Sequence, residues 1–287
     1  MHLLFLILNY KTYKDTIRLT KEICQEGHGD YYVLIVDNAS PNESYSEMSS
    51  AFKSNPKVEV IQSSVNGGYA KGNNYGLKYA KKYNPEYVCI MNNDVHFTWN
   101  TIENLVSIYS KLESPAIISP IQYLPNGERA KFIEFRVPNL LYDLRMNTLF
   151  LKPKFQQYVS NTKWHNVQKV GYLPGALLFA DYSIFERIGF FDECTFLFCE
   201  ERFTGKMVQR MGLNNYVILD LSYVHEHSKT INNEASLKRQ RQLIHEGRLK
   251  YYERYSRCPA FTKFILNFSF HFHEFELYVI SALRNLK

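Results

Sequence analysis

Residues 87–94 read YVCIMNND, an apolar run that ends in two asparagines and an aspartate. Residues 3–8 and 32–36 are apolar runs of similar length, and each is also followed by polar residues. Runs this short are typical of buried β-strands, and segments with helical periodicity separate them. The alternation is typical of βαβ units and predicts an α/β fold with a mostly parallel sheet.

Helix signals appear between these runs. Thr12, with Asp15 three residues later, predicts a helix start, and that helix should end near Gly27. Ser40 or Asn42 could cap the next helix. Further elements are expected as a strand at 58–61, a helix from the Gly-rich turn 66–72 to about 83, a helix from about 200 to 212, and a strand from 216 that continues to 225.

The bulk composition is that of a globular protein. The 287 residues are 45% hydrophobic and 22% charged, which suits one large domain or a domain with a smaller appendage. The net charge of +6 suits an anionic ligand or membrane face but is too small to indicate a nucleic-acid partner. Five scattered cysteines without a CxxC pair favour a reducing compartment, and hence a cytoplasmic location. The first apolar run lacks a preceding basic region and is interpreted as a strand rather than a signal peptide.

Polar residues follow successive strands of the predicted sheet. In an open parallel sheet, ligands bind at the carboxyl ends of the strands, so these residues should gather along one edge. Turns also favour Asn, Asp and Gly, and each motif alone is explained as well by turn formation. Their joint occurrence at four strand ends favours a binding site, with the motifs at 9–10, 37–38, 66–68 and 92–94.

Eight motifs occur in an order that resembles family 2 glycosyltransferases of the rhamnosyltransferase-like branch, namely residues 8–10, 36–40, 66–76, 91–94, 175–178, 189–192, 196–201 and 224–228. The resemblance covers about residues 2–230. It implies a GT-A fold, a Rossmann-like αβα sandwich, over residues 1–231, with a nucleotide-sugar half in about 1–120 and an acceptor half in about 121–231. Residues 232–287 would form a helical C-terminal extension.

The resemblance implies a divalent cation, Mn²⁺ or Mg²⁺, at the end of the fourth strand. Asn92-Asn93-Asp94 is similar to the family's DXD motif, and Asp94 carries the charge that a hard cation needs. Asn92 stands where many relatives have Asp, so this site has one negative charge fewer. His225 matches a late His of the family that completes the metal shell, and His227 would contact phosphate or acceptor.

Glu200 and Glu201 match the family's acidic pair at the start of a helix. Inverting transfer needs a carboxylate that takes a proton from the acceptor hydroxyl, and by position Glu201 is the expected base, with Glu200 binding acceptor. Acidic residues also favour helix N-termini for electrostatic reasons alone. By the same resemblance, Gly175 and Ala176 would form a tight floor beside the acceptor.

The donor pocket is expected along the first three strand ends. Asp37 resembles the residue that reads the nucleobase, and Asn9 and Tyr10 would line the same pocket. Gly68 would let the backbone approach the nucleotide, while Lys71 could reach phosphate or remain in solvent. The remaining expected donor contacts are Asn66, Asn73, Asn92 and Asn93.

The function implied by the resemblance is inverting transfer of a hexose or deoxyhexose. The donor would be a UDP- or dTDP-sugar, and the acceptor a glycan or lipid-linked oligosaccharide of capsule, O-antigen or exopolysaccharide synthesis. Sugar nucleotidyl transfer is an alternative, but it needs a Gly-rich basic loop after the first strand, which 9–13 does not supply. The missing first Asp of the metal motif leaves open a catalytically weak sugar-nucleotide-binding homologue or scaffold.

The C-terminal segment has a different composition. Residues 234–256 are basic and helical in pattern, Pro259 interrupts the chain, and 261–286 is rich in aromatic residues. Such a helix is too apolar to stand free in solvent. It could lie on the inner face of the membrane as a peripheral contact, or pack against the catalytic domain or a second subunit in a homodimer.

Overall fold

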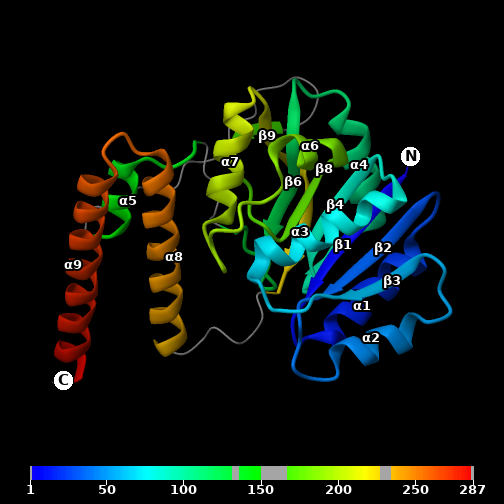
Figure 1. Cartoon of the computed structure of the whole chain (residues 1–287), viewed down its shortest axis with the longest axis horizontal. Coiled ribbons are helices and arrows are strands. Elements are labelled where there is room, and N and C mark those ends of the chain that lie inside the picture. Colours follow the sequence, from blue (N-terminus) through cyan, green and yellow to red (C-terminus); the bar gives the residue numbers. More distant parts are fainter. Residues whose placement is uncertain (1, 131–135, 150–166, 227–233, 286–287) are drawn as a thin grey trace.

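The computed structural model describes residues 2–130, 136–149, 167–226 and 234–285. Figure 1 shows a central sheet with helices on its faces, and a pair of long C-terminal helices beside it. His227, one of the expected acceptor contacts, lies outside the described residues.

The described residues form a nine-stranded sheet of mostly parallel strands. Its parallel half has the order β3-β2-β1-β4, with β1 at Leu3–Asn9, β2 at Tyr31–Asp37, β3 at Val58–Gln62 and β4 at Tyr87–Asn92. The antiparallel strand β8 (Leu177–Asp181) joins β4 to β6 (Pro115–Tyr123), which pairs in parallel with β9 (Asn214–His225). Two short strands, β5 (Val95–His96) and β7 (Val167–Val170), run antiparallel to β9.

Helices cover both faces of the sheet because its strands are apolar on both sides. Along β1, Leu3, Phe5 and Ile7 face one core cluster, and Leu4 and Leu6 face the other. The first cluster includes residues of α1 (Tyr13–Glu26), α2 (Ser44–Phe52) and α4 (Trp99–Tyr109), and the second includes residues of α3 (Gly68–Ala80), α6 (Tyr182–Ile188) and α7 (Glu200–Arg210). The predicted αβα sandwich is therefore confirmed.

The start of α1 differs from the expected capping pattern. Thr12 is the N-cap, but its side chain makes no capping hydrogen bond. Its hydroxyl instead accepts a hydrogen bond from Asn93 Nδ2 at 2.7 Å. At α1, a distant polar partner thus replaces the local one that sequence spacing suggests. At α2, the N-cap is Glu43, so neither Ser40 nor Asn42 occupies the expected position, although Asn42 Oδ1 accepts a hydrogen bond from the Ser44 hydroxyl at 2.7 Å.

The C-terminal helices form an antiparallel hairpin against α7. Helix α8 (Glu234–Tyr255) and α9 (Pro259–Asn285) are separated at Pro259, as the sequence indicates. A third core cluster joins Phe203 of α7 to Tyr251 and Tyr252 of α8 and Leu266 of α9. The short helix α5 (Leu140–Met146) lies beside the hairpin and contacts α9 (Figure 1). Among the described helices, none has the length and apolar content needed to cross a bilayer.

A buried carboxylate connects these helices. Asp143 of α5 accepts two hydrogen bonds from Arg202 of α7, at 2.6 and 2.8 Å, and one from the Tyr252 hydroxyl at 2.6 Å. Arg248 Nε lies 3.2 Å from the same carboxylate. Burial raises the pKa of Asp143, but the two arginines and the Tyr252 hydroxyl outweigh it and hold the pKa below its usual value. Asp143 is thus an anion that joins its own helix, α5, to α7 and α8.

The replacement Asp143→Asn is expected to lower the free energy of unfolding by about 3–5 kcal/mol at neutral pH, because it leaves two buried arginines without their counter-charge. The contribution of Asp143 is present above its unfolded pKa and is lost only as pH falls through its lowered native pKa. Denaturant unfolding measures the change. Glu113→Gln, which breaks the exposed pair with Lys169, is the control and should leave the free energy of unfolding almost unchanged. Equal losses in the two variants would contradict this account.

Candidate active site

Strands β1, β2, β4 and β9 end at one edge of the sheet, and their last residues are joined by a buried polar network. Asn9 donates to Asp37 Oδ1 at 2.8 Å and accepts from the Thr16 hydroxyl at 2.8 Å. Asn93 Nδ2 approaches Thr16 Oγ1 at 2.8 Å. The side chains following three separate strands therefore lie in one continuous cluster, as strand order predicts.

The Asp37 carboxylate is already occupied by protein donors. It is 0% exposed, and its Oδ2 accepts from the Ser40 amide at 3.0 Å and from Gln62 Nε2 at 2.9 Å. These bonds hold the ends of β1, β2 and β3 together. Tyr10, by contrast, is exposed at this edge. Of the expected nucleobase contacts, Tyr10 is thus accessible to solvent, whereas Asn9 and Asp37 are buried in the network.

The Gly-rich turn makes close contact with another protein segment. Gly68 has a φ of +78°, and a Cβ built there would lie 1.8 Å from the carbonyl oxygen of Phe196. That carbonyl accepts a hydrogen bond from the Tyr69 amide at 3.0 Å. Gly68 is therefore required for the approach of the segment that precedes Glu200. The prediction that Gly68 approaches a nucleotide remains a prediction.

The other expected donor contacts of this region differ in exposure. Asn66 accepts from Asn38 Nδ2 and from the Gly68 amide, each at 3.0 Å, and so shapes the turn. Asn73 is buried within α3, where its Nδ2 donates to the Tyr69 carbonyl at 3.0 Å. Lys71 is exposed and its side chain packs over Gly67. Lys71 is thus the residue of this set that is free to reach a ligand from solution.

Asp94 and His225, 131 residues apart, form a close pair. Asp94 Oδ1 lies 3.0 Å from His225 Nε2, and the two side chains are 12% and 10% exposed. Their backbones are held together because Val95 pairs with His225 and the Glu226 amide donates to the Asp94 carbonyl. Asn92 Nδ2 is 3.3 Å from the same ring nitrogen. The two residues that the resemblance assigns to metal binding are therefore neighbours.

Gln122, at the end of β6, is a neighbour of His225 that sequence reasoning missed. Its Nε2 lies 3.3 Å from His225 Nδ1, and its Oε1 accepts from the Tyr223 hydroxyl at 3.1 Å. A partner on the second ring nitrogen fixes the orientation of a metal-binding imidazole. The rule that polar residues gather at strand ends would have identified Gln122.

The donor set at Asp94 and His225 suits a hard divalent cation. Within the described residues, no group of three or more His, Cys, Asp or Glu side chains is arranged to hold a metal ion. The pair offers one carboxylate and one imidazole, beside the Asn92 amide. Mg²⁺ and similar ions bind through one or two protein carboxylates together with substrate phosphates and waters. The residues therefore fit an ion that is shared with a diphosphate.

The segment before Glu200 has an unusual backbone. Phe198 and Cys199 both have positive φ values, 68° and 70°, which cost about 1–3 kcal/mol each for residues with a side chain. Helix α8 supports this turn. Cys199 Sγ donates to the Ile244 carbonyl at 3.4 Å, and Gly247 leaves space for the Cys199 side chain. Such strain persists where surrounding structure enforces it, and it is frequent at functional sites.

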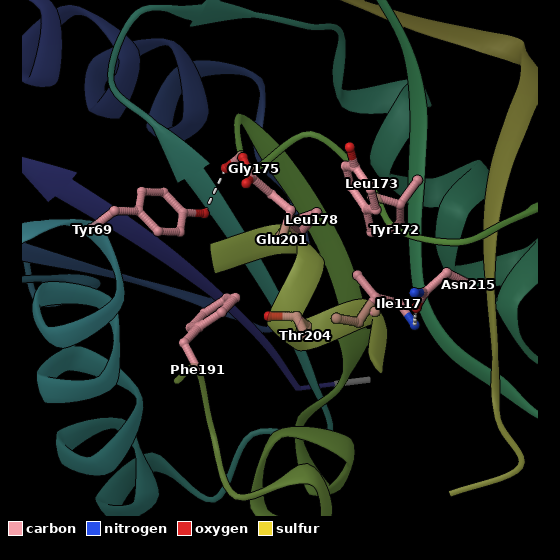
Figure 2. A pocket seen from close by; sticks show the side chains of 11 residues that line it. Tyr69, Ile117, Tyr172, Leu173, Gly175, Leu178, Phe191, Glu201, Thr204 and Asn215 are labelled. Carbon is pink, nitrogen blue, oxygen red and sulfur yellow. Dashed lines mark hydrogen bonds between the residues drawn. The ribbon is translucent and has the colours of Figure 1, made fainter. Parts of the chain in front are cut away.

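Glu201 lines a small cavity of about 10 Å³, roughly the space of one water molecule. Figure 2 shows Glu201 with Tyr69, Gly175 and Thr204 around this cavity, and the Tyr69 hydroxyl donates to the Gly175 carbonyl at 2.6 Å. Burial raises the pKa of Glu201, and its own amide and that of Gly175 partly oppose the shift. The cavity therefore holds a carboxyl group whose pKa is above its usual value.

Glu200 occupies a different environment from Glu201. It is buried, and its Oε2 has no hydrogen-bond partner among the described residues. Burial, together with the negative charge of Glu201, raises the pKa of Glu200 well above its usual value. Because Glu200 does not line the cavity, Glu201 is the better placed of the two to meet a substrate.

Gly175 and Ala176 connect the two parts of the site. The Ala176 carbonyl accepts from the Asn92 amide at 2.9 Å, at the end of β4 that carries Asp94. Gly175, one residue earlier, lines the cavity with Glu201. The candidate metal pair and the candidate base thus lie on either side of this dipeptide.

Comparisons with known proteins identify relatives in sequence and in fold. The sequence model of the family described as Glycosyl transferase family 2 matches residues 5–159. The low-salt glycan biosynthesis hexosyltransferase Agl10 of Haloferax volcanii is 29% identical over 197 residues, which cover 68% of this chain. The matched segment spans 58% of the length of Agl10.

Solved structures with low sequence identity share the fold. The GalNAc-T7 structure with UDP, GalNAc and Mn²⁺ has a TM-score of 0.61 at 12% identity and covers 93% of this chain and 55% of its own. The mannosyltransferase PcManGT of Pyrobaculum calidifontis, in complex with GDP-Man and Mn²⁺, has a TM-score of 0.61 at 15% identity, with 98% and 75% covered. TarS of S. aureus with UDP-GlcNAc has a TM-score of 0.53 at 15% identity, with 96% and 73% covered.

The family match begins in β1 and includes the ends of β1, β2 and β4, where the polar network and Asp94 lie. It covers more than half of the 287 residues, so the chain belongs to glycosyl transferase family 2.

Proposed function

We propose that this chain transfers a sugar, with inversion, from a nucleoside-diphosphate donor to a hydroxyl group of a glycan. The observation that carries the proposal is the position of Asp94 and His225 on one side of Gly175-Ala176 and of Glu201 on the other. An ion-binding pair for the diphosphate and a base for the acceptor are the two groups that a single displacement at the anomeric carbon requires.

The proposed donor is a UDP- or dTDP-sugar. Similar folds bind UDP, UDP-GlcNAc and GDP-Man, so the sugar and base of the donor are matters for experiment. Tyr10 and Lys71 are exposed at the edge where a nucleotide would lie, and they are its proposed first contacts. The proposed divalent cation is held by Asp94 and His225, and when bound it would neutralise charge on the leaving diphosphate. Two structures of similar fold contain Mn²⁺, which supports this cofactor.

The proposed base is Glu201. Its carboxylate takes the proton of the acceptor hydroxyl as that oxygen forms a bond to the anomeric carbon, and the bond between that carbon and the diphosphate oxygen breaks. The nucleoside diphosphate leaves with the electron pair. A pKa above the usual value makes Glu201 a stronger base than an exposed glutamate.

The proposed acceptor is a glycan or lipid-linked oligosaccharide that enters beside Gly175 and Ala176. Gly175 lines the cavity that contains Glu201 and that would receive the acceptor hydroxyl, and Glu200 remains a predicted acceptor contact. A lipid-linked acceptor and a cytoplasmic location remain predictions from the sequence.

The replacement Glu201→Gln is expected to lower kcat by about 10²–10⁴-fold, because it removes proton acceptance and keeps the shape of the side chain. Donor affinity, measured by calorimetry, should stay within about twofold. The matched control is Glu246→Gln, an exposed glutamate of α8, and it should leave kcat unchanged. Near-normal turnover of Glu201→Gln would place the base elsewhere. Absence of turnover in the unmodified chain, with normal donor binding, would favour a catalytically weak homologue.

The pH profile should report the ionisation of the base. Since Glu201 must be deprotonated and its pKa is raised, kcat/KM is expected to increase with pH through that raised pKa and then level off. The acidic limb should therefore lie above the usual glutamate value of 4.5. A profile that is flat down to pH 4.5 would exclude Glu201 as the group that titrates.

The replacement Asp94→Asn is expected to weaken Mn²⁺-dependent donor binding by about tenfold or more, because it removes the carboxylate of the proposed metal site. A Mn²⁺ titration at fixed donor concentration measures the effect. Asp30→Asn, which changes an exposed aspartate paired with His2, serves as the control. If the two variants have the same Mn²⁺ dependence as the unmodified chain, the metal does not bind at Asp94.

A further inference from the structure

Helix α9 presents a continuous apolar face to solvent. Phe264 and Phe268 are each 69% exposed, and they belong to a row of exposed apolar side chains that also includes Phe261, Phe272, Phe275, Val279 and Leu283. We call these seven residues the outer face of α9. In Figure 1, α9 is the element farthest from the sheet, beyond α8.

The opposite face of α9 is already packed. Leu266 is fully buried in the cluster with Phe203, and Thr262 and His273 are also buried. Phe270 stacks on His245 of α8, with ring centroids 4.1 Å apart. The helix is thus fixed by its inner face, and no side chain of the outer face belongs to a core cluster of the described residues. A continuous row of seven exposed apolar side chains is typical of a surface that contacts another molecule or a membrane.

The spacing of the outer face follows an 11-residue repeat. The intervals from Phe261 to Leu283 are 3, 4, 4, 3, 4 and 4 residues. At about 100° per residue, eleven residues drift only about 20° from three full turns, so the row runs nearly straight for about 33 Å. A heptad repeat would instead wind as a left-handed supercoil with a partner helix. The repeat therefore differs from the heptad of a left-handed coiled coil, and the row forms one nearly straight apolar face.

The hairpin carries nearly all of the net positive charge. Residues 234–287 contain ten Lys and Arg and five Asp and Glu, a balance of +5, whereas the whole chain has +6. Exposed basic side chains occur near both ends of the hairpin, at Lys238 and Arg239 and at Arg257. A flat apolar face within a basic hairpin is complementary to an anionic lipid surface.

We propose that the outer face of α9 lies on an anionic membrane, with the helix axis parallel to the membrane plane. The aromatic side chains enter the interface, and the basic residues contact lipid headgroups. This proposal deepens the proposed function, on which its biological purpose rests, because a lipid-linked acceptor would then be in the surface to which the chain binds. Vesicle binding itself requires no transfer, so the two can fail independently.

The test uses the full chain with vesicles of equal parts phosphatidylglycerol and phosphatidylcholine. The double variant Phe264→Ser/Phe268→Ser is expected to reduce co-sedimentation affinity by at least about tenfold, since each phenylalanine contributes apolar burial. Both side chains are exposed, so the variant should fold, and its melting temperature checks this. The control Tyr45→Ser/Met211→Ser removes two exposed apolar side chains from the catalytic body and should bind as the unmodified chain does.

Binding should also decrease on pure phosphatidylcholine vesicles and at high salt, because both remove the attraction of the basic hairpin. Equal vesicle affinity of the Phe264→Ser/Phe268→Ser variant and the unmodified chain would overturn the proposal. The proposal would also be overturned if the unmodified chain did not bind vesicles but formed a dimer in sedimentation velocity, and if this variant were a monomer. The Glu201→Gln variant should bind vesicles normally, because the membrane contact does not need transfer. Vesicle binding by an unmodified chain that transfers no sugar would reject the proposed function and not the membrane contact.

Discussion

The direction of the strands is the constraint on which the site depends. Strands β1, β2, β4, β6 and β9 run the same way and end at one edge, while β8 runs in reverse and begins there. The reversal brings Gly175-Ala176 beside the end of β4, between Asp94 and Glu201. Polar groups are excluded from strands that are buried on both faces, so they collect where the strands end. Topology alone thus assembles residues from four distant parts of the chain.

The C-terminal hairpin contacts the segment that precedes α7, the helix that carries Glu201. On α8, Lys250 donates to the Cys194 carbonyl at 2.6 Å, and Arg254 pairs with Asp192. With the Cys199 contact and the Asp143–Arg202 pair, these bonds fix the turn that begins α7. The hairpin therefore has two faces with separate roles. Its inner face holds the segment that carries the proposed base, and its outer face is the proposed membrane contact, so attachment to lipid would act on an element that is rigidly joined to the site.

Much of this arrangement could be predicted from the sequence, because it follows from periodicity and strand ends. The parallel half-sheet and the break at Pro259 are of this kind, whereas the proximity of Asp94 to His225 is implied by the family resemblance. What could not be predicted depends on partners far away in the chain. The internal bonds of Asp37, the contact of Gly68 with Phe196 and the burial of Asp143 are set by tertiary packing, and no local pattern indicates them.

Binding of a nucleotide sugar tests the central claim most directly. Thermal unfolding would be followed with UDP-, dTDP- and GDP-sugars, each with Mn²⁺ and with a chelator. The account predicts that at least one of these donors raises the melting temperature, that Mn²⁺ enlarges the increase, and that His225→Ala removes the part due to Mn²⁺. If no nucleotide sugar stabilises the chain under either condition, the polar edge of the sheet is not a donor site and the proposed transfer is wrong.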